Sequence, residues 1–244
     1  MREPRLARDR QQWIFDYLVQ ETGKVFHWEE DGRPLPKSVK SHAQISKHLG
    51  RIGQRLERVA AEEDAAGHSA TAFELYHRAS STFALAQHPV LENNDEKRYL
   101  HGRCIANYEK VIEHAPYPIE RLEVPFEGVE LQCNFHMLPG KPNAPLVIFI
   151  PGCDMTKENY PDPRIMQSHL RGMHMLVIDG PGQGMSNLRG IKLTPDNYER
   201  AVLAIAEYMA EREEVDAEKI VVYALSMGAH WGLEVAASGH PLIK

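Results

Sequence analysis

The sequence predicts an α/β protein in which a helical N-terminal domain precedes a mostly parallel sheet whose first strands are antiparallel. Residues 1–116 repeat apolar side chains at the three-to-four spacing of helices. Further on, "APLVIFIPG", "MHMLVIDG" and "KIVVYAL" are continuous apolar runs separated by helical segments, a pattern typical of strands covered on both faces. We place the domain boundary at residues 116–120, giving domains 1–116 and 117–244.

The helical half is expected to contain a first helix with Trp13 and Tyr17 on one face and a second helix running past Ile45. Gly67 breaks the second helix, and Ser69 is the expected N-cap of the third. The third helix is expected to bury Phe73, Tyr76, Ala79 and Phe83. A last helix from about residue 95 is expected to turn inward Tyr99, Leu100, Ile105, Tyr108, Val111 and Ile112.

The second half is expected to begin with two strands, residues 121–126 and 129–138, joined by a turn at Glu127 and Gly128. Helices are expected at residues 157–170 and 195–212 between the later strands. The second of these helices has Thr194 as its expected N-cap and Pro195 at its first helical position.

Composition excludes several classes of function. The chain has 244 residues and a formal net charge of −6, which argues against a nucleic-acid partner because phosphate contacts need a basic face. No run approaches the roughly 18 apolar residues of a membrane span, and no signal peptide is evident, so a cytoplasmic protein is expected. The three cysteines are widely spaced and no HExxH organises the histidines, which argues against a disulfide framework or zinc site.

The segment "YALSMGAHWG" is the strongest candidate for catalytic chemistry. Ser226 directly follows the apolar run "KIVVYAL" and precedes a helical segment. A nucleophile elbow needs small residues two before and two after its serine, and here these are Ala224 and Gly228. The pentapeptide A-x-S-x-G is weak evidence alone, because serines among small residues often only start helices. At the end of a parallel strand it indicates that Ser226 is a nucleophile.

Two further Gly-containing turns follow strands of the predicted sheet. "IPGCDMTKEN" stands where such enzymes place an oxyanion turn, so the backbone N–H groups of Cys153 and Met227 are the expected oxyanion donors. A reactive-thiol role for Cys153 is a less favoured alternative. "IDGPGQGMS" has neither G-x-G-x-x-G nor GK[ST] spacing, which favours a tight loop shaping the site over a phosphate loop.

In this order, "PGCDMTKE", "DGPGQGMS" and "YALSMGAHWG" resemble the α/β-hydrolase superfamily. With "AAGHSATAFELYHRAS" and "YPIERLEVPFEGVELQCNFHMLP", the chain is similar to the branch with an N-terminal helical cap. That branch includes 2,6-dihydropseudooxynicotine hydrolase, FrsA-type esterases and fungal heptaketide-shortening hydrolases. The resemblance implies a cap over the pocket and hydrolysis of a small-molecule ester, or of a carbon–carbon bond beside a ketone. It implies no cofactor and no metal.

The superfamily's triad runs Ser, then Asp or Glu, then His, on successive strand ends. This chain ends at Lys244, shortly after the elbow, so we expect the N-terminal portion of a longer hydrolase, with the triad acid and His missing. "KIVVYAL" is then expected to form an apolar sheet edge, and a homodimer through the cap or that edge is an expectation.

Other titratable residues near these motifs are expected to have supporting or alternative roles. His230 and His240 are alternatives for a stand-in base, although His230 is more often a pocket-rim residue at such a position. Asp154 and Lys157 are expected to brace the oxyanion turn as a local ion pair. Asp179 is expected to order the Gly/Pro loop that follows it.

Two non-enzymatic alternatives remain open from the sequence. A hydrolase-derived binding protein or inactive fragment would keep the pocket and lose catalysis, although a pure binder has no need of a strained serine. A helical-repeat scaffold over residues 38–115 would need Tyr76, Tyr99 and Tyr108 to be exposed.

Overall fold

The computed structural model describes residue 39 and residues 41–244; the expected helix with Trp13 and Tyr17 lies outside the described residues. By its contacts the chain divides into two units, Met1–Tyr108 and Glu109–Lys244. In the part of the chain that the structure describes, no helix is long and apolar enough to cross a membrane.

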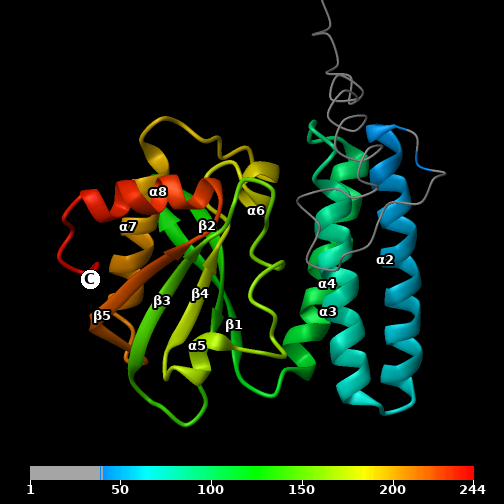
Figure 1. Cartoon of the computed structure of the whole chain (residues 1–244), viewed down its shortest axis with the longest axis horizontal. Helices are drawn as coiled ribbons and strands as arrows, with labels where there is room; N and C mark the ends of the chain where they lie inside the picture. The colour runs from blue at the N-terminus through cyan, green and yellow to red at the C-terminus, as the bar shows by residue number, and fades with distance from the viewer. Residues whose placement is uncertain (1–38, 40) are drawn as a thin grey trace, which may run out of the picture. The chain divides into compact units, whose positions relative to one another are not determined.

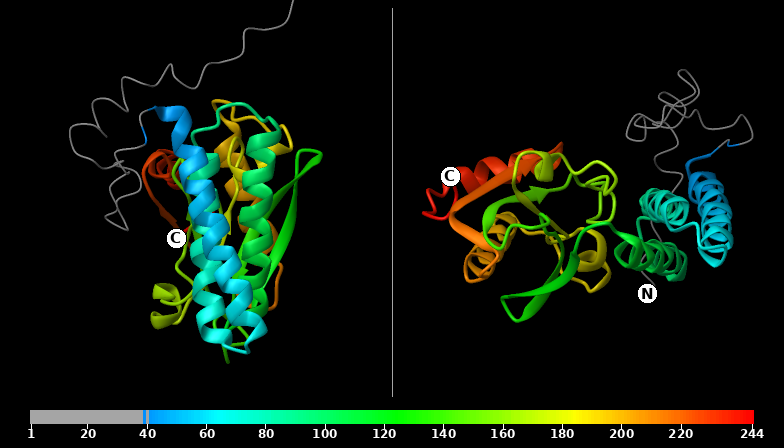
Figure 2. Two further views of the ribbon diagram at one scale, coloured as in Figure 1. Left: turned by 90° about the vertical axis from the view of Figure 1, so that its right-hand side faces the viewer. Right: turned by 90° about the horizontal axis from the view of Figure 1, so that it is seen from below.

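The described part of the first unit is a set of helices lying side by side (Figures 1 and 2), in agreement with the helical N-terminal half predicted from the sequence. Their bounds are α2 His42–Ala65, α3 Ser69–Gln87 and α4 Asp95–His114, and the residues of α4 after Tyr108 belong to the second unit. Gly67 joins α2 to α3 with a φ of 79°, a left-handed conformation that suits glycine. The expected inward residues of α3 are buried. A core cluster formed by α3, α4 and their connection contains Phe83, Ala84, Ala86, Val90, Leu100 and Cys104.

Two expectations in this unit are wrong. Ser69 is the first residue of α3, and the N-cap is His68, whose ring lies 2.7 Å from the Glu63 carboxylate. Tyr99 is 51% exposed, because the buried stripe of α4 passes through Leu100 and Cys104 and leaves Tyr99 beside it. Tyr76 and Tyr108 are buried, which argues against the repeat-scaffold alternative.

The second unit is built on a five-stranded sheet in the order β1-β2-β4-β3-β5. The strands are β1 Ile119–Phe126, β2 Val129–His136, β3 Ala144–Ile150, β4 His174–Ile178 and β5 Val215–Ala224. β2 pairs antiparallel with β1 and β4, whereas β3 pairs parallel with β4 and β5. The predicted α/β class with antiparallel first strands is confirmed, and the sheet is mixed, because two of its four strand pairs are antiparallel and two are parallel. Glu127 and Gly128 make the first hairpin turn with φ values of 47° and 82°.

Helices of the second unit connect and cover these strands; they are α5 Gln167–Leu170, α6 Gly184–Leu188, α7 Asn197–Ala210 and α8 Met227–Ala237. α7 and α8 contact one another and the strands. The main core gathers apolar side chains of the sheet with Val202 and Ile205 of α7 and Trp231 and Val235 of α8. Burial of these helix faces fixes α8 against the sheet and so fixes the turn from which it starts.

Two predicted helices differ from the structure. Of residues 157–170 only Gln167–Leu170 is helical, because Pro161 and Pro163 each lack an N–H group and disfavour helix in the residue before them. The other helix, α7, begins at Asn197, and its N-cap is Asp196 rather than Thr194. The Thr194 N–H donates to Asn197 Oδ1 at 2.9 Å, which closes a separate turn ahead of the helix.

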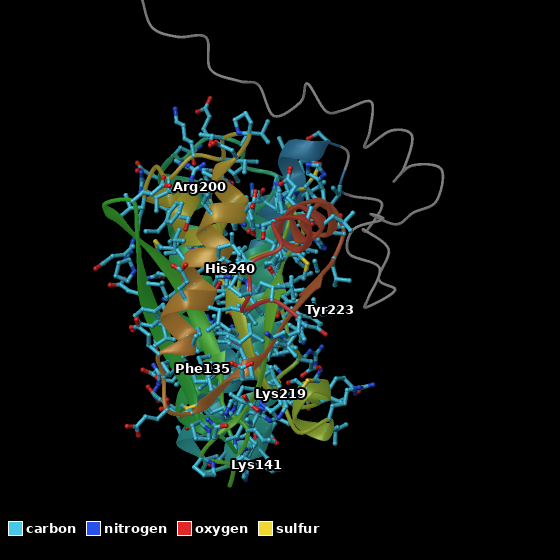
Figure 3. All side chains as sticks on the ribbon, turned by 90° about the vertical axis from the view of Figure 1, so that its left-hand side faces the viewer. Phe135, Lys141, Arg200, Lys219, Tyr223 and His240 are labelled. Atoms are coloured by element: carbon cyan, nitrogen blue, oxygen red, sulfur yellow. The ribbon has the colours of Figure 1, made fainter. Side chains whose placement is uncertain are left out.

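β5 lies at the end of the sheet, as expected for residues 219–225. Its outer side carries, within the described residues, only an isolated parallel bridge from Ile220 to Ile243. Figure 3 views the molecule from this side, with Lys219 and Tyr223 along the strand; Tyr223 is 45% exposed.

His174, the first residue of β4, is a buried histidine with a fixed tautomer. Its Nδ1 accepts the Leu138 N–H at 2.8 Å, so its Nε2 carries the proton and donates to the Glu214 carbonyl at 2.9 Å. Burial lowers the pKa of His174 below its usual 6.5, and this outweighs the opposing influence of Glu214. Protonation of Nδ1 would remove the acceptor for Leu138.

We expect the free energy of unfolding to fall as the pH drops below about 6.5, because His174 then binds a proton in the unfolded chain more readily than in the native protein. Urea unfolding at about pH 7.5 and about pH 5.5 measures this loss. The pKa of His169 is also lowered by burial, so the His174→Gln variant should flatten the dependence in part and the double variant with His169→Gln more fully. An unchanged slope in the double variant would contradict this account.

Candidate active site

Ser226 occupies a sharp turn between a strand and a helix. β5 ends at Ala224, α8 begins at Met227, and Ser226 between them has φ 54° and ψ −127°. Glu127, in the hairpin turn, is the other described non-glycine residue with positive φ. Such a backbone conformation costs about 1–3 kcal/mol and persists only where the surrounding structure enforces it. The position of the turn was therefore predicted from the sequence, and the strained backbone conformation of Ser226 is seen only in the structure.

Glycines allow the start of α8 to approach the end of β3 closely. A Cβ atom on Gly228 would lie 2.4 Å from the carbonyl oxygen of Ile150 and 2.5 Å from that of Pro151. These distances are too short for any residue with a side chain, so only glycine fits at this position. A Cβ on Gly152 would lie 3.0 Å from the Cβ of Ser226. The turn after β3 is thus pressed directly against the serine.

Cys153 and Met227 carry the two backbone N–H groups that the sequence predicts as oxyanion donors. Within the described chain, neither Cys153 nor Met227 donates its backbone N–H to another residue. Met227 is the first residue of α8, where an N–H has no acceptor inside the helix and lies at the positive end of the helix dipole. Groups of this kind can stabilise an oxygen anion that develops beside Ser226.

The Cys153 thiol is poorly suited to be a nucleophile. Cys153 is exposed, but partial burial of its thiol raises the thiol pKa above the usual value, and the charge of Asp154 adds to the effect. Because the thiolate is the reactive form of cysteine, the thiol is held in its less reactive state. This disfavours the reactive-thiol alternative for Cys153.

Gln183 is a buried residue at this site that the sequence analysis missed. Its Nε2 donates to the carbonyl oxygens of Gly152 at 2.7 Å and Pro151 at 3.2 Å. Its Oε1 accepts the Gly180 N–H at 3.2 Å and a short hydrogen bond from the Tyr198 hydroxyl. One side-chain amide thus holds the turn after β3, the Gly/Pro loop after β4 and α7 together.

The same network reaches α8 through an aromatic pair. The rings of Tyr198 and Trp231 are stacked, with centroids 3.9 Å apart and an interplanar angle of 8°. Gly180 has no room for a side chain, because a Cβ there would lie 2.4 Å from the Tyr198 ring. The helix that begins beside Ser226 is therefore fixed to α7 and, through Gln183, to the Gly152 turn.

A buried ion cluster fixes the rest of the Gly/Pro loop. Lys157 Nζ lies 2.9 Å from Asp179 Oδ2 and 2.7 Å from Glu158 Oε1, and these side chains have no exposed surface. Burial by itself lowers the pKa of Lys157, but the charges of Asp179 and Glu158 outweigh it and raise the pKa above its usual value. Lys157 therefore pairs with Asp179 and Glu158, and the expected pairing with Asp154 is wrong.

Asp179 orders the loop that follows it, as expected. Its Oδ2 accepts the Met185 N–H at 2.9 Å, and its carbonyl accepts the Ser186 hydroxyl at 2.7 Å. Gly184 is needed where it stands, because a Cβ there would lie 2.2 Å from Asp179 Oδ2.

The structure brings neither candidate histidine into a hydrogen bond with Ser226. His230 Nε2 lies 3.3 Å from Glu234, and His240 Nε2 lies 3.3 Å from Glu207. The Ser226 side chain makes no capping hydrogen bond to the N–H groups of α8. The stand-in base considered for either histidine gains no support from these contacts.

A pocket of about 520 Å³ lies beside the residue that follows Ser226, and Ser226 itself is not among its lining residues. Cys153 and Met227 line it, together with Gln183 and with Trp231 of α8. The candidate oxyanion donors, the residue that bridges the turns and the nucleophile helix therefore border one cavity. Its volume is in the range usual for small-molecule sites.

A mixed α/β sheet whose parallel strands end in a Gly-containing turn and a strained serine turn defines the α/β-hydrolase class. The model of the FrsA-like esterase family matches residues 49–238, and the chain belongs to that family. The resemblance predicted from the sequence motifs is confirmed.

Relatives within this class are named hydrolases. The chain is 31% identical over 216 residues to the alpha/beta hydrolase ucsC of an Acremonium species, which covers 79% of this chain and 43% of that protein. It is 26% identical over 189 residues to 2,6-dihydropseudooxynicotine hydrolase of Paenarthrobacter nicotinovorans, which covers 76% of this chain and 49% of that protein.

A solved structure, the crystal structure of the 2,6-dihydroxy-pseudo-oxynicotine hydrolase, superimposes with a TM-score of 0.71 at 25% identity. The match covers 92% of this chain and 61% of that chain. The chain spans about half the length of the curated relatives it matches.

Proposed function

We propose that the protein is a serine hydrolase in which Ser226 is the nucleophile and the backbone N–H groups of Cys153 and Met227 form the oxyanion hole. The observation that carries this proposal is the strained conformation of Ser226 with the Gly152 turn pressed against it. A protein that needed no reactive serine would have no reason to maintain that strain. Membership of the FrsA-like esterase family supports the same reaction class.

The proposed substrate is a small molecule with an ester, or with a carbon–carbon bond beside a ketone. Ser226 Oγ attacks the carbonyl carbon, its proton passes to a general base, and the carbonyl oxygen becomes an anion held by the two N–H groups. The carbon–oxygen or carbon–carbon bond then breaks, and the leaving alkoxide or enolate takes the proton. Water releases the acyl group from Ser226 by the same steps.

We place the general base and its acid partner outside the residues that the structure describes around Ser226. His230 and His240 each face a carboxylate of their own, and neither is hydrogen-bonded to the serine. Without a base the hydroxyl is a weak nucleophile, so this placement is part of the proposal.

The test is a pre-steady-state assay of the protein at its native length with neutral 4-nitrophenyl esters and, separately, with β-diketones. For the ester reaction we expect a burst of nitrophenol about equal to the enzyme concentration, followed by slower turnover, because an acyl-enzyme accumulates. The non-catalytic binding alternative predicts saturable binding with no release above the buffer rate. That outcome with both substrate classes and a folded protein would overturn the proposal.

Gln183 is proposed to position the oxyanion turn, so Gln183→Leu should lower kcat about tenfold with a smaller change in KM. The substitution leaves the carbonyls of Pro151 and Gly152 without their donor, and we expect the free energy of unfolding to fall by about 2–4 kcal/mol. Steady-state kinetics and urea unfolding measure the two effects.

Gln132→Leu is the matched control, because Gln132 is also largely buried but donates to Glu123 on the neighbouring strand. It should leave kcat unchanged. Equal loss of kcat in both variants would mean that Gln183 acts only through stability.

A further inference from the structure

The pocket lined by Cys153 and Met227 contains one carboxylate among mostly apolar residues. Its apolar wall includes Leu193, Pro181 and Trp231, and its acidic group is Glu234, whose Oε1 lies 3.3 Å from Nε2 of the His230 ring. Neither lysine nor arginine is among the described residues that line it. An anionic ligand would therefore meet the Glu234 carboxylate with no lysine or arginine of the lining to offset it.

The position of the pocket ties it to the reacting group. Cys153 and Met227, the proposed oxyanion donors, form part of its lining, and Met227 directly follows Ser226. A substrate carbonyl held by these N–H groups therefore has the pocket immediately beside it. The group attached to that carbonyl is the part of the substrate that the pocket can receive.

We propose that this pocket binds an uncharged apolar group of the substrate, aryl or alkyl, next to the reacting carbonyl, and that Glu234 discriminates against anionic substrates. This inference rests on the proposed function for the identity of the reacting carbonyl. The binding preference itself is independent of catalysis and is measured without turnover.

Trp231 offers a direct probe, because it lines the pocket and the chain has three tryptophans. Replacing Trp13 and Trp28 by phenylalanine leaves Trp231 as the single tryptophan of this sequence. The ligands are neutral 4-nitroacetophenone and anionic 4-nitrobenzoate, which share a ring that quenches tryptophan fluorescence. We expect saturable quenching by the ketone and about tenfold weaker binding of the carboxylate.

Variants at the charged end of the pocket test the selectivity. Glu234→Gln should reduce the preference for the ketone about threefold or more, and Glu234→Lys should abolish or reverse it. Glu211→Lys, at the far end of α7, makes the same charge change away from the pocket and should preserve the preference. Unchanged selectivity in Glu234→Lys, or equal changes in the two lysine variants, would overturn the role of Glu234.

Variants at the apolar wall test the location. Leu193→Asp should weaken ketone binding about tenfold, whereas Leu233→Asp should leave it unchanged. Leu193 is 46% exposed and lines the pocket, and Leu233 is 71% exposed on α8 outside the lining, so both changes should be compatible with folding. Linear, unsaturable quenching, or binding unaffected by Leu193→Asp, would overturn the pocket assignment.

The two proposals fail in different ways. Saturable, charge-selective quenching with no turnover would refute the hydrolase function and leave the pocket as a binding site. Turnover of neutral aryl esters whose KM is unaffected by Leu193→Asp would preserve the hydrolase and refute the pocket.

Discussion

The Ser226→Ala variant is expected to lose roughly 10⁴- to 10⁶-fold in kcat, the loss seen when a serine nucleophile that acts with its partners is removed. The free energy of unfolding should change by less than about 1 kcal/mol, because Ser226 is exposed and its side chain makes no helix-capping hydrogen bond. Steady-state kinetics under substrate saturation, with urea unfolding of the same preparation, separate the two quantities.

A second variant at this position, Ser226→Gly, separates the loss of activity from the relief of backbone strain. Glycine adopts a φ of 54° without the strain that a side chain brings, so this variant should be inactive yet more stable by about 1 kcal/mol. Ser238→Ala, at the other end of α8, is the matched control and should retain kcat. Activity retained in Ser226→Ala would place the reaction at another residue.

The Lys157→Met variant is expected to lower the free energy of unfolding by about 3–5 kcal/mol. Lys157 lies between Asp179 and Glu158 with no exposed surface, so its removal leaves two carboxylates in a medium that solvates them poorly. The loop from Asp179 to Met185 should loosen with it, because Asp179 also accepts the Met185 N–H. Urea unfolding followed by circular dichroism gives the magnitude.

Lys219→Met is the matched control for this loss. Lys219 pairs with Asp216 at 2.8 Å, but its side chain is 65% exposed (Figure 3). An exposed pair of this kind is worth about 0–1 kcal/mol, so the control should be nearly neutral. Similar small losses in both variants would show that the buried cluster contributes no more than a surface ion pair.

The sheet and the serine turn could be predicted because their signals are local. Continuous apolar runs identified β3, β4 and β5, and Ala224 and Gly228 on either side of Ser226 marked the sharp turn at the end of the last of them. The structure shows why Gly228 is required, since its neighbours are the carbonyls at the end of β3.

The predictions that failed depend on partners distant in the sequence or on competing turns. Residues 157–166 were expected to be helical, but Pro161 and Pro163 disfavour a helix there, and Lys157 is held in the interior by Asp179, 22 positions later. The N-cap expected at Thr194 is wrong because the Asn197 side chain accepts the Thr194 N–H, which places Thr194 in a separate turn before α7. Gln183 was missed because a glutamine between glycines indicates only a loop, and its acceptors belong to the turn after β3.

The most direct test of the central claim is to map the covalent adduct formed when the native-length protein reacts with a fluorophosphonate. The serine oxygen displaces fluoride, so an O–P bond forms as the P–F bond breaks. We predict one adduct per chain, located by peptide mass spectrometry on Ser226 and absent from Ser226→Ala. No adduct on the folded protein, or an adduct on another residue such as Cys153, would contradict the assignment of Ser226 as the nucleophile.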